Sequence, residues 1–174
     1  IVELVDFEAS ERIKLISDNA QWFEDHSPID EKFRKEQVTG VSMNVVNAVM
    51  LGGDCYPATP IGVNLPNADW IREEYGSKSI SLSNITHAYH EASKESGVLT
   101  EFAATEREVA LQEKYGALSD DLHTQLHECL GHGSGRMKPG VTLDDLKAYG
   151  STIEEARADL FALFFMADGK MLEL

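Results

Sequence analysis

The stretch 125-QLHECLGHGSG-135 places two histidines, His127 and His132, five residues apart in a segment that otherwise has the composition of a helix. Glu128 follows the first histidine and Gly131 precedes the second. In a regular α-helix each residue turns the chain by about 100°, so side chains five residues apart point about 140° away from each other. The two imidazoles can meet only where the helix widens locally into a π-bulge, and glycine tolerates such a distortion. We therefore predict a π-bulge at Gly131.

A glutamate beside one of two convergent histidines is typical of zinc peptidases, whose usual helix carries His-Glu-x-x-His. Zinc binds neutral imidazoles, and catalytic sites usually combine three protein ligands with a water, from which Glu128 would accept a proton. A helix with two unrelated histidines and a surface glutamate has the same pattern, so both readings stay open at this point. His123 lies four residues before His127 but lacks an adjacent glutamate, and we treat it as a bystander or minor contributor.

A second segment, 151-STIEEARADLFALFF-165, carries acidic residues at helical spacing. Ser151 or Thr152 can cap a helix here, with Glu154 or Glu155 completing a capping box. Taken alone, this pattern is explained well enough by capping.

The same segment also suits metal binding. Glu155 and Asp159 lie one turn apart and share a helix face. The apolar residues that follow predict that this helix enters the core; they include Leu160, Leu163 and Phe164. Because buried carboxylates are unfavourable unless they are paired or bind a metal, the acidic cluster favours a metal site with a third ligand from this helix.

Three segments, HECLGH (127–132), EEARAD (154–159) and GVNLPN (62–67), together resemble the motifs of the dipeptidyl peptidase III family of zinc exopeptidases. The five-residue spacing of the histidines is distinctive of that family. The resemblance implies a Zn²⁺-dependent enzyme that releases dipeptides from the free N-terminus of short peptides. The segment between HECLGH and EEARAD is short. In this respect the chain is similar to bacterial members of the family.

The resemblance also implies roles for individual residues of the metal site. His127, His132 and Glu155 match the zinc ligands of the family. Glu128 matches the catalytic glutamate, which takes a proton from water and passes it to the leaving amine.

Four further residues match supporting positions. Glu154 and Asp159 match carboxylates that hydrogen-bond the ligand histidines, although Asp159 has a shorter side chain than the more familiar glutamate. Asn64 and Asn67 match residues that hold the substrate backbone near its N-terminus. Read without the resemblance, the two asparagines are ordinary turn formers.

Composition limits the possible partners. The formal net charge of −15 argues against a nucleic-acid partner, because phosphate binding needs concentrated Lys and Arg. Uninterrupted apolar runs are too short to span a membrane. Two cysteines, Cys55 and Cys129, do not make a disulfide framework and suit a reducing compartment, so we expect a cytoplasmic location. Nothing in the sequence indicates an oligomeric state.

Apolar residues at helical spacing dominate the chain, and alternating strand patterns are scarce. We predict a mainly α fold with little β, in which residues 52–69, rich in Pro and Gly, form a long ordered loop. Ser119 is a good N-cap for a helix whose leucines, from Leu118 to Leu130, recur every four residues on a buried face. Residues 41–51 suit either a helix or a buried strand. The predicted helices span 7–24, 81–94, 101–115, 119–132 and 152–167.

The ends of the chain lead us to expect a fragment of a larger protein. Residues 1–174 would form a single domain, part of the helical zinc-binding lobe of a two-lobed peptidase. The resemblance implies that a β-rich lobe and further catalytic residues lie outside this chain. Two alternatives stay open: a non-catalytic zinc- or peptide-binding helical module, and a helical interaction domain without metal.

Overall fold

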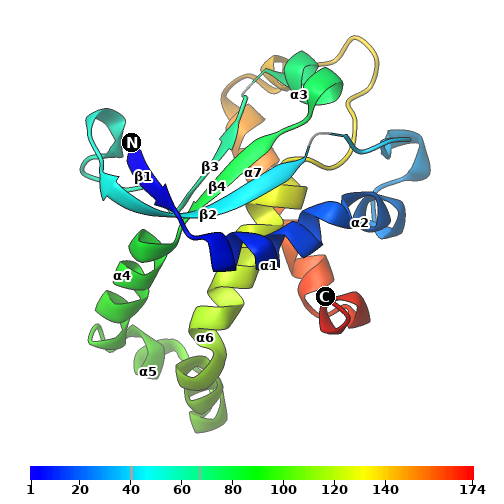
Figure 1. Cartoon of the computed structure of the whole chain (residues 1–174). Coiled ribbons are helices and arrows are strands. Elements are labelled where there is room, and N and C mark those ends of the chain that lie inside the picture. The colour runs from blue at the N-terminus through cyan, green and yellow to red at the C-terminus, as the bar shows by residue number, and fades with distance from the viewer. Residues whose placement is uncertain (40, 67) are drawn as a thin grey trace.

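The computed structural model describes residues 1–39, 41–66 and 68–174. A four-stranded sheet lies across one side of a group of helices (Figure 1). The strand order is β1-β2-β4-β3, with β2 and β4 parallel and both outer pairs antiparallel. The strands are β1 (Val2–Val5), β2 (Ser42–Met50), β3 (Gly62–Leu65) and β4 (Lys78–Leu82).

Helices account for most of the regular structure, which confirms the predicted mainly α fold. The α-helices of the described residues are α1 (Phe7–Asp18), α2 (Ala20–His26), α3 (Asp69–Tyr75), α4 (Ser83–Lys94), α5 (Val98–Phe102), α6 (Glu106–Leu126) and α7 (Gly150–Met166). A π-helical turn, η3 (His127–Gly131), continues α6. Short 3-10 segments are η1 (Glu31–Phe33), η2 (Gly53–Cys55), η4 (Leu143–Tyr149) and η5 (Gly169–Leu172).

The hydrophobic core joins β2 to α1, α2, η3 and α7. Phe23 and Phe165 are fully buried and meet edge to face, with ring centroids 4.9 Å apart. Cys129 of η3 is also fully buried in this cluster and packs as a small apolar residue. The turn that carries the histidines is therefore anchored in the core on its apolar side.

The predicted helix over 7–24 is two helices, because the chain turns at Asn19. The side chain of Asn19 donates to the carbonyl of Leu15, a local bond that competes with helix continuation. The second helix ends at His26, with Ser27 as its C-cap before Pro28, as the Ser-Pro pair predicts.

The predicted helices over 101–115 and 119–132 are wrong as separate elements, because α6 runs unbroken from Glu106 into η3. Its N-cap is Thr105, which forms a capping box with Glu108; Ser119 lies in the helix interior and is not a cap. The predicted leucine face is also only partly buried: Leu126 and Leu130 are in the core, whereas Leu118 is 60% exposed.

Helix α7 begins earlier than predicted, so neither Ser151 nor Thr152 caps it. The 3-10 segment η4 runs directly into α7 at Gly150. A Cβ at Gly150 would lie 2.9 Å from the carbonyl oxygen of Leu143, so this junction needs a glycine. Both serine and threonine therefore already lie inside the first turn.

The core-facing side of α7 also differs from the prediction. Leu160, Leu163 and Phe164 are exposed, and the buried side chains are Ala158, Phe161, Ala162 and Phe165. This helix is apolar on both sides, so the sequence pattern alone does not decide which side packs inward.

The sheet is the part of the fold that the sequence pattern revealed least. Residues 42–50 form strand β2, which resolves the ambiguity there, but β1 and β4 were not predicted. The Pro- and Gly-rich segment over 52–69 contains η2 and strand β3 in addition to ordered loop. Among the described residues, no helix has the length and apolar content to cross a membrane.

Candidate metal centre

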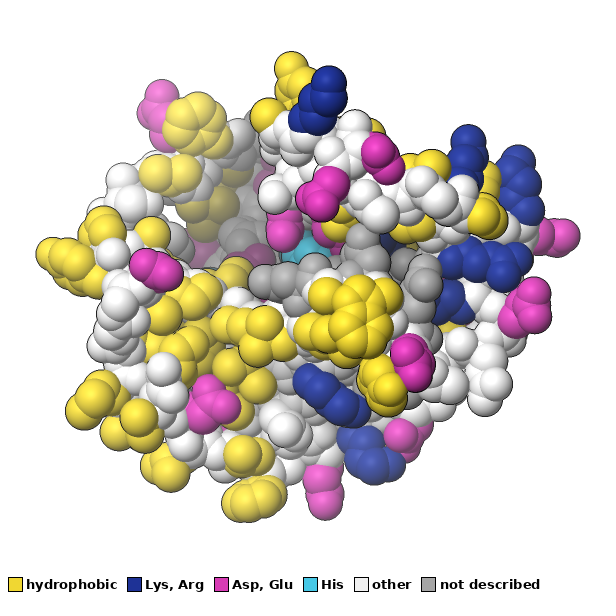
Figure 2. All heavy atoms as spheres, turned by 90° about the horizontal axis from the view of Figure 1, so that it is seen from above, with side chains coloured by type: hydrophobic (Ala, Val, Ile, Leu, Met, Phe, Trp, Pro, Cys, Tyr) yellow, Lys and Arg dark blue, Asp and Glu magenta, His cyan; other side chains and the backbone are white. Residues whose placement is uncertain are grey.

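The turn η3 begins at the first histidine of the signature, has the second, His132, as its C-cap, and confirms the predicted π-bulge. The amide of His132 donates to the carbonyl of His127, five residues back, at 3.1 Å. The two imidazole rings consequently meet edge to face, with centroids 4.7 Å apart. One potential metal-ligand atom from each of His127, Glu128 and His132 lies within 4.8 Å of the other two. The surface of the molecule is hollowed on the face seen from above in Figure 2. A histidine side chain is visible in this hollow, beside acidic side chains.

Gly131 has a role in this turn that differs from the one expected. It is not among the described glycines with positive φ, so left-handed backbone is not the reason for it. Instead, a Cβ at Gly131 would lie 2.8 Å from the carbonyl oxygen and 2.9 Å from the Cα of Ala158. Glycine is needed here because α7 packs directly against the π-helical turn.

That close approach brings three carboxylates of α7 to the histidines. Asp159 accepts a hydrogen bond from Nδ1 of His127 at 2.8 Å, and Glu154 accepts one from Nδ1 of His132 at 3.0 Å. A carboxylate on Nδ1 fixes the tautomer and leaves the Nε2 lone pair for a metal, as in many zinc sites.

The third carboxylate, Glu155, faces both remaining nitrogens. Its Oε2 lies 3.2 Å from Nε2 of His127, and its Oε1 lies 3.8 Å from Nε2 of His132. The side chain is 60% exposed, so the group opens toward solvent. Two imidazoles and one carboxylate form a donor set that zinc accepts in catalytic sites. The residues present therefore fit a zinc ion.

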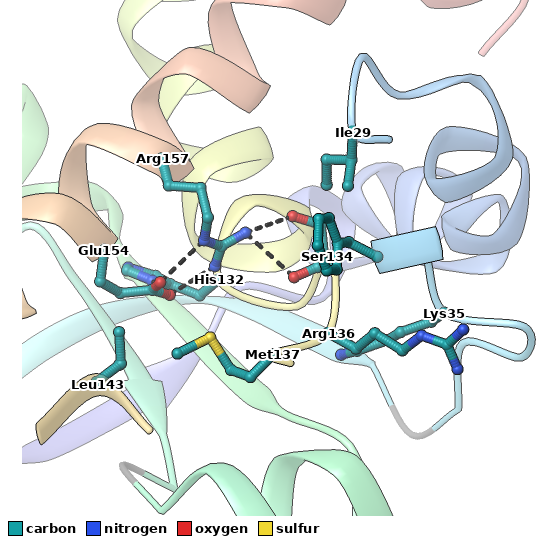
Figure 3. Close-up of a pocket in the computed structure, with 11 residues that line it drawn as sticks. Ile29, Lys35, His132, Ser134, Arg136, Met137, Leu143, Glu154 and Arg157 are labelled. Atoms are coloured by element: carbon teal, nitrogen blue, oxygen red, sulfur yellow. Dashed lines mark hydrogen bonds and ion pairs between the residues drawn. The ribbon is translucent and has the colours of Figure 1, made fainter. Parts of the chain in front are cut away.

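Arg157 supports this arrangement from the same helix (Figure 3). It donates to both carboxylate oxygens of Glu154, at 2.9 and 2.6 Å, and to the hydroxyl of Ser134 at 2.7 Å. Together with His132, these residues line a cavity of about 260 Å³. Burial would raise the pKa of Glu154, but hydrogen bonds and charge from His132 and Arg157 outweigh it and lower the pKa to about 2. The carboxylate that orients His132 is thus held ionised.

The carboxylate of Glu128 lies against strand β3. A Cβ placed on Gly62 would come within 2.4 Å of Oε1 of Glu128, so the glycine leaves the space that this side chain occupies. The backbone carbonyl of Glu128 accepts hydrogen bonds from Ser79 Oγ at 2.7 Å and from Asn64 Nδ2 at 3.1 Å.

Asn64 therefore lies at the site, where its side chain contacts the backbone carbonyl of Glu128. Its Nδ2 also donates to Ser79 Oγ at 2.7 Å, and its buried Oδ1 has no hydrogen-bond partner within residues 1–39, 41–66 and 68–174. Asn67 lies outside the described residues. Ser79 is a site residue that the sequence analysis missed, since a lone serine in a five-residue segment carries no recognisable signal.

His123 stands apart from the metal-ligand group. Its ring centroid lies 6.2 Å from that of His127, and its Nε2 lies 3.5 Å from Oδ1 of Asp159. In the described part of the chain, the group of possible metal ligands comprises His127, Glu128 and His132 and includes neither His123 nor Glu155. Glu155 is placed at the site by its distances of 3.2 and 3.8 Å to the two Nε2 atoms, and His123 has no such contact with them. Its treatment as a bystander agrees with this geometry.

Comparisons with known proteins agree with the motifs. The family model for Peptidase family M49 matches residues 1–141. The chain is 27% identical to dipeptidyl peptidase 3 of Dictyostelium discoideum over 206 residues, covering 99% of this chain and 28% of that protein.

Two solved structures are similar over 94% of this chain. The structure of DPP III from Caldithrix abyssi has a TM-score of 0.74 at 27% identity, and this chain covers 32% of it. That of dipeptidyl-peptidase III from Corallococcus sp. strain EGB has a TM-score of 0.81 at 24% identity, with 31% covered. The chain thus spans about a third, or less, of the length of the proteins it matches.

Proposed function

The chain belongs to peptidase family M49, and on that basis we propose that it is the zinc-binding part of an exopeptidase that releases dipeptides from the free N-terminus of short peptides. In this proposal residues 1–174 form one domain within the catalytic lobe. Because the chain spans only part of its relatives, the whole enzyme's activity and substrates are included in the proposal.

The observation that carries the proposal is the convergence of five side chains at the end of α6. The two Nε2 atoms face Glu155, while each Nδ1 is held by a separate carboxylate. We assign His127, His132 and Glu155 as zinc ligands, with Glu154 and Asp159 as their orienting partners. Zinc supplies a Lewis acid that polarises a carbonyl and lowers the pKa of water.

Glu128 is the general base in this proposal. Its carboxylate lies beside the histidines and is confined on its other side by Gly62. From there it accepts a proton from the attacking water and returns it to the leaving amine. The resemblance assigns the peptide backbone to Asn64 and Asn67. Because Asn64 Nδ2 donates to Ser79 and to the Glu128 carbonyl, Asn64 binds the peptide through Oδ1, which accepts no hydrogen bond from the described residues.

The experiment is a Glu128→Gln substitution. Glutamine keeps the size of the side chain but cannot accept the proton, so we expect hydrolysis of a dipeptidyl-arylamide to fall by about 10²- to 10⁴-fold. Zinc affinity, measured by competition with a chelator, should remain at the wild-type value. Full activity in the glutamine variant would refute the role of Glu128.

A second candidate is a non-catalytic zinc module. It is favoured because a carboxylate oxygen of Glu128 lies within 4.8 Å of a ring nitrogen of each histidine, close enough for Glu128 to share the metal. If Glu128 were itself a fourth ligand, the site would be closed and structural. The same variant separates the two candidates, because loss of a ligand would weaken zinc binding whereas loss of a base would not.

A cytoplasmic location is part of the proposal and rests on the two cysteines, which form no disulfide. Cell fractionation followed by detection of the protein tests it. Recovery from an oxidising compartment would exclude it.

A further inference from the structure

We propose that Ser79 and Asn64 act together as a positioning pair that holds the π-helical turn open, and so aims His127, Glu128 and His132 at one point. This inference rests on the proposed function, since it concerns the same site. Neither residue binds the metal in this proposal. Both act through the backbone carbonyl of Glu128.

The three groups form a closed set of hydrogen bonds. The hydroxyl of Ser79 donates its one proton to the Glu128 carbonyl at 2.7 Å and accepts from Asn64 Nδ2 at 2.7 Å. Asn64 Nδ2 has two protons and gives the other to the same carbonyl at 3.1 Å. The Glu128 carbonyl therefore receives two side-chain donors from the sheet.

The sheet gives this pair a rigid base. Asn64 and Ser79 are direct cross-strand partners on β3 and β4. Strand β4 is also bonded to β2 on its other side, where Ser79 is paired with Met43. Ser79 is 3% exposed, and η3 packs against β2, β3 and β4 (Figure 1). The backbone of Ser79 cannot move without disturbing two strand pairings.

The bonded carbonyl is the one that decides between the two helical geometries. In a regular α-helix the amide of His132 would donate to the carbonyl of Glu128, four residues back. Here that amide donates to His127 instead, while the sheet side chains bind the Glu128 carbonyl. Without them, the carbonyl becomes available to His132, the turn tightens, and His132 rotates away by roughly the 100° of one helical residue.

The experiment compares Ser79→Ala with Ser77→Ala. Ser77 is equally buried, at 1% exposed, and its hydroxyl has no hydrogen-bond partner among the described residues, so its loss is the matched control. Two quantities are measured on the purified protein: the dissociation constant for zinc, by chelator competition, and the hydrogen-exchange rate of the His132 amide in the metal-free protein.

We expect Ser79→Ala to weaken zinc binding by about tenfold, the effect typical of losing an outer partner of a metal site. It should also change the exchange rate of the His132 amide, whereas Ser77→Ala changes neither quantity. Asn64→Asp, which keeps the side-chain shape but removes both donated bonds, should reproduce the effect of Ser79→Ala. Equal zinc affinity and equal exchange in the Ser79 and Ser77 variants would overturn the inference.

The two readouts keep this inference separate from the proposed function. If the wild-type protein binds no zinc, the proposed function fails, and the exchange rate of the His132 amide still decides whether Ser79 holds the turn. If the wild-type protein binds zinc but Ser79→Ala alters neither readout, only the positioning pair is refuted.

Discussion

Gly62 and Gly131 set how closely the chain packs around the histidines. Gly131 lets the backbone of α7 at Ala158 touch the π-helical turn, and Gly62 lets the side chain of Glu128 lie on strand β3. A Cβ at Gly131 would meet backbone atoms of Ala158, whereas a Cβ at Gly62 would meet the end of the flexible Glu128 side chain. Substitution of Gly131 would therefore disturb the fold, whereas substitution of Gly62 would disturb the placement of Glu128.

We predict that Gly62→Ala lowers the rate of dipeptidyl-arylamide hydrolysis by about 10²-fold, because a displaced catalytic group loses its alignment. A new Cβ would lie 2.4 Å from Oε1 of Glu128, so the carboxylate has to move. Zinc affinity should not change. Gly52→Ala is the control, since nothing lies within 4 Å of that position. Equal rates for the two variants would show that the position of Glu128 is not critical.

Arg157 offers a second test at the level of one residue. We predict that Arg157→Met weakens zinc binding by about tenfold, because Glu154 loses its bidentate partner and no longer fixes the ring of His132. The control is Arg12→Met, which breaks an exposed ion pair with Glu8 on α1. Chelator competition measures both, and an unchanged dissociation constant for the Arg157 variant contradicts the prediction.

The site could be predicted from sequence where its residues are neighbours in the chain. The motifs contain His127, Glu128, His132 and the acids of α7, and periodicity shows which of them share a helix face. Gly62 stands in the GVNLPN motif, but its contact with Glu128 could not be found in this way, and Ser79 stands in no motif. Both reach the site through the sheet, from strands far away in sequence. Contacts of that kind leave no local pattern.

At the scale of elements, η3 with its C-cap and α7 carry every side chain assigned to the metal, and η3 continues α6. Their ends were predicted poorly for related reasons. Ser119 is a good capping residue by type, but Thr105 and Glu108 satisfy each other's backbone amides and begin the helix earlier. At α7, the contact of Gly150 with Leu143 moves the start of the helix. Tertiary contacts and competing caps override a local preference.

We predict that Thr105→Ala lowers the free energy of unfolding by about 1 kcal/mol, the usual effect of losing an N-cap side chain. Ser119→Ala should be neutral or slightly stabilising, because alanine is favourable in a helix interior. Urea denaturation of the two variants measures both changes. A larger loss from Ser119→Ala would mean that the helix begins at Ser119.

On the scale of the whole molecule, the sheet and α7 hold the π-helical turn from two sides. The mainly α character was predictable because four of the described α-helices, α1, α4, α6 and α7, have 12 or more residues. The sheet was not, because β1, β3 and β4 are four or five residues long and β1 is exposed throughout. Short strands acquire their structure from pairing, which the sequence of each strand does not reveal.

The central claim is that α6, η3 and α7 together bring His127, His132 and Glu155 to one zinc ion. A crystal structure of the zinc-loaded protein, with anomalous data collected on both sides of the zinc absorption edge, tests it most directly. We predict one anomalous peak bonded to Nε2 of both histidines and to the Glu155 carboxylate, with η3 still π-helical. A regular α-helical turn at Gly131, or a peak bonded to other residues, would contradict the claim.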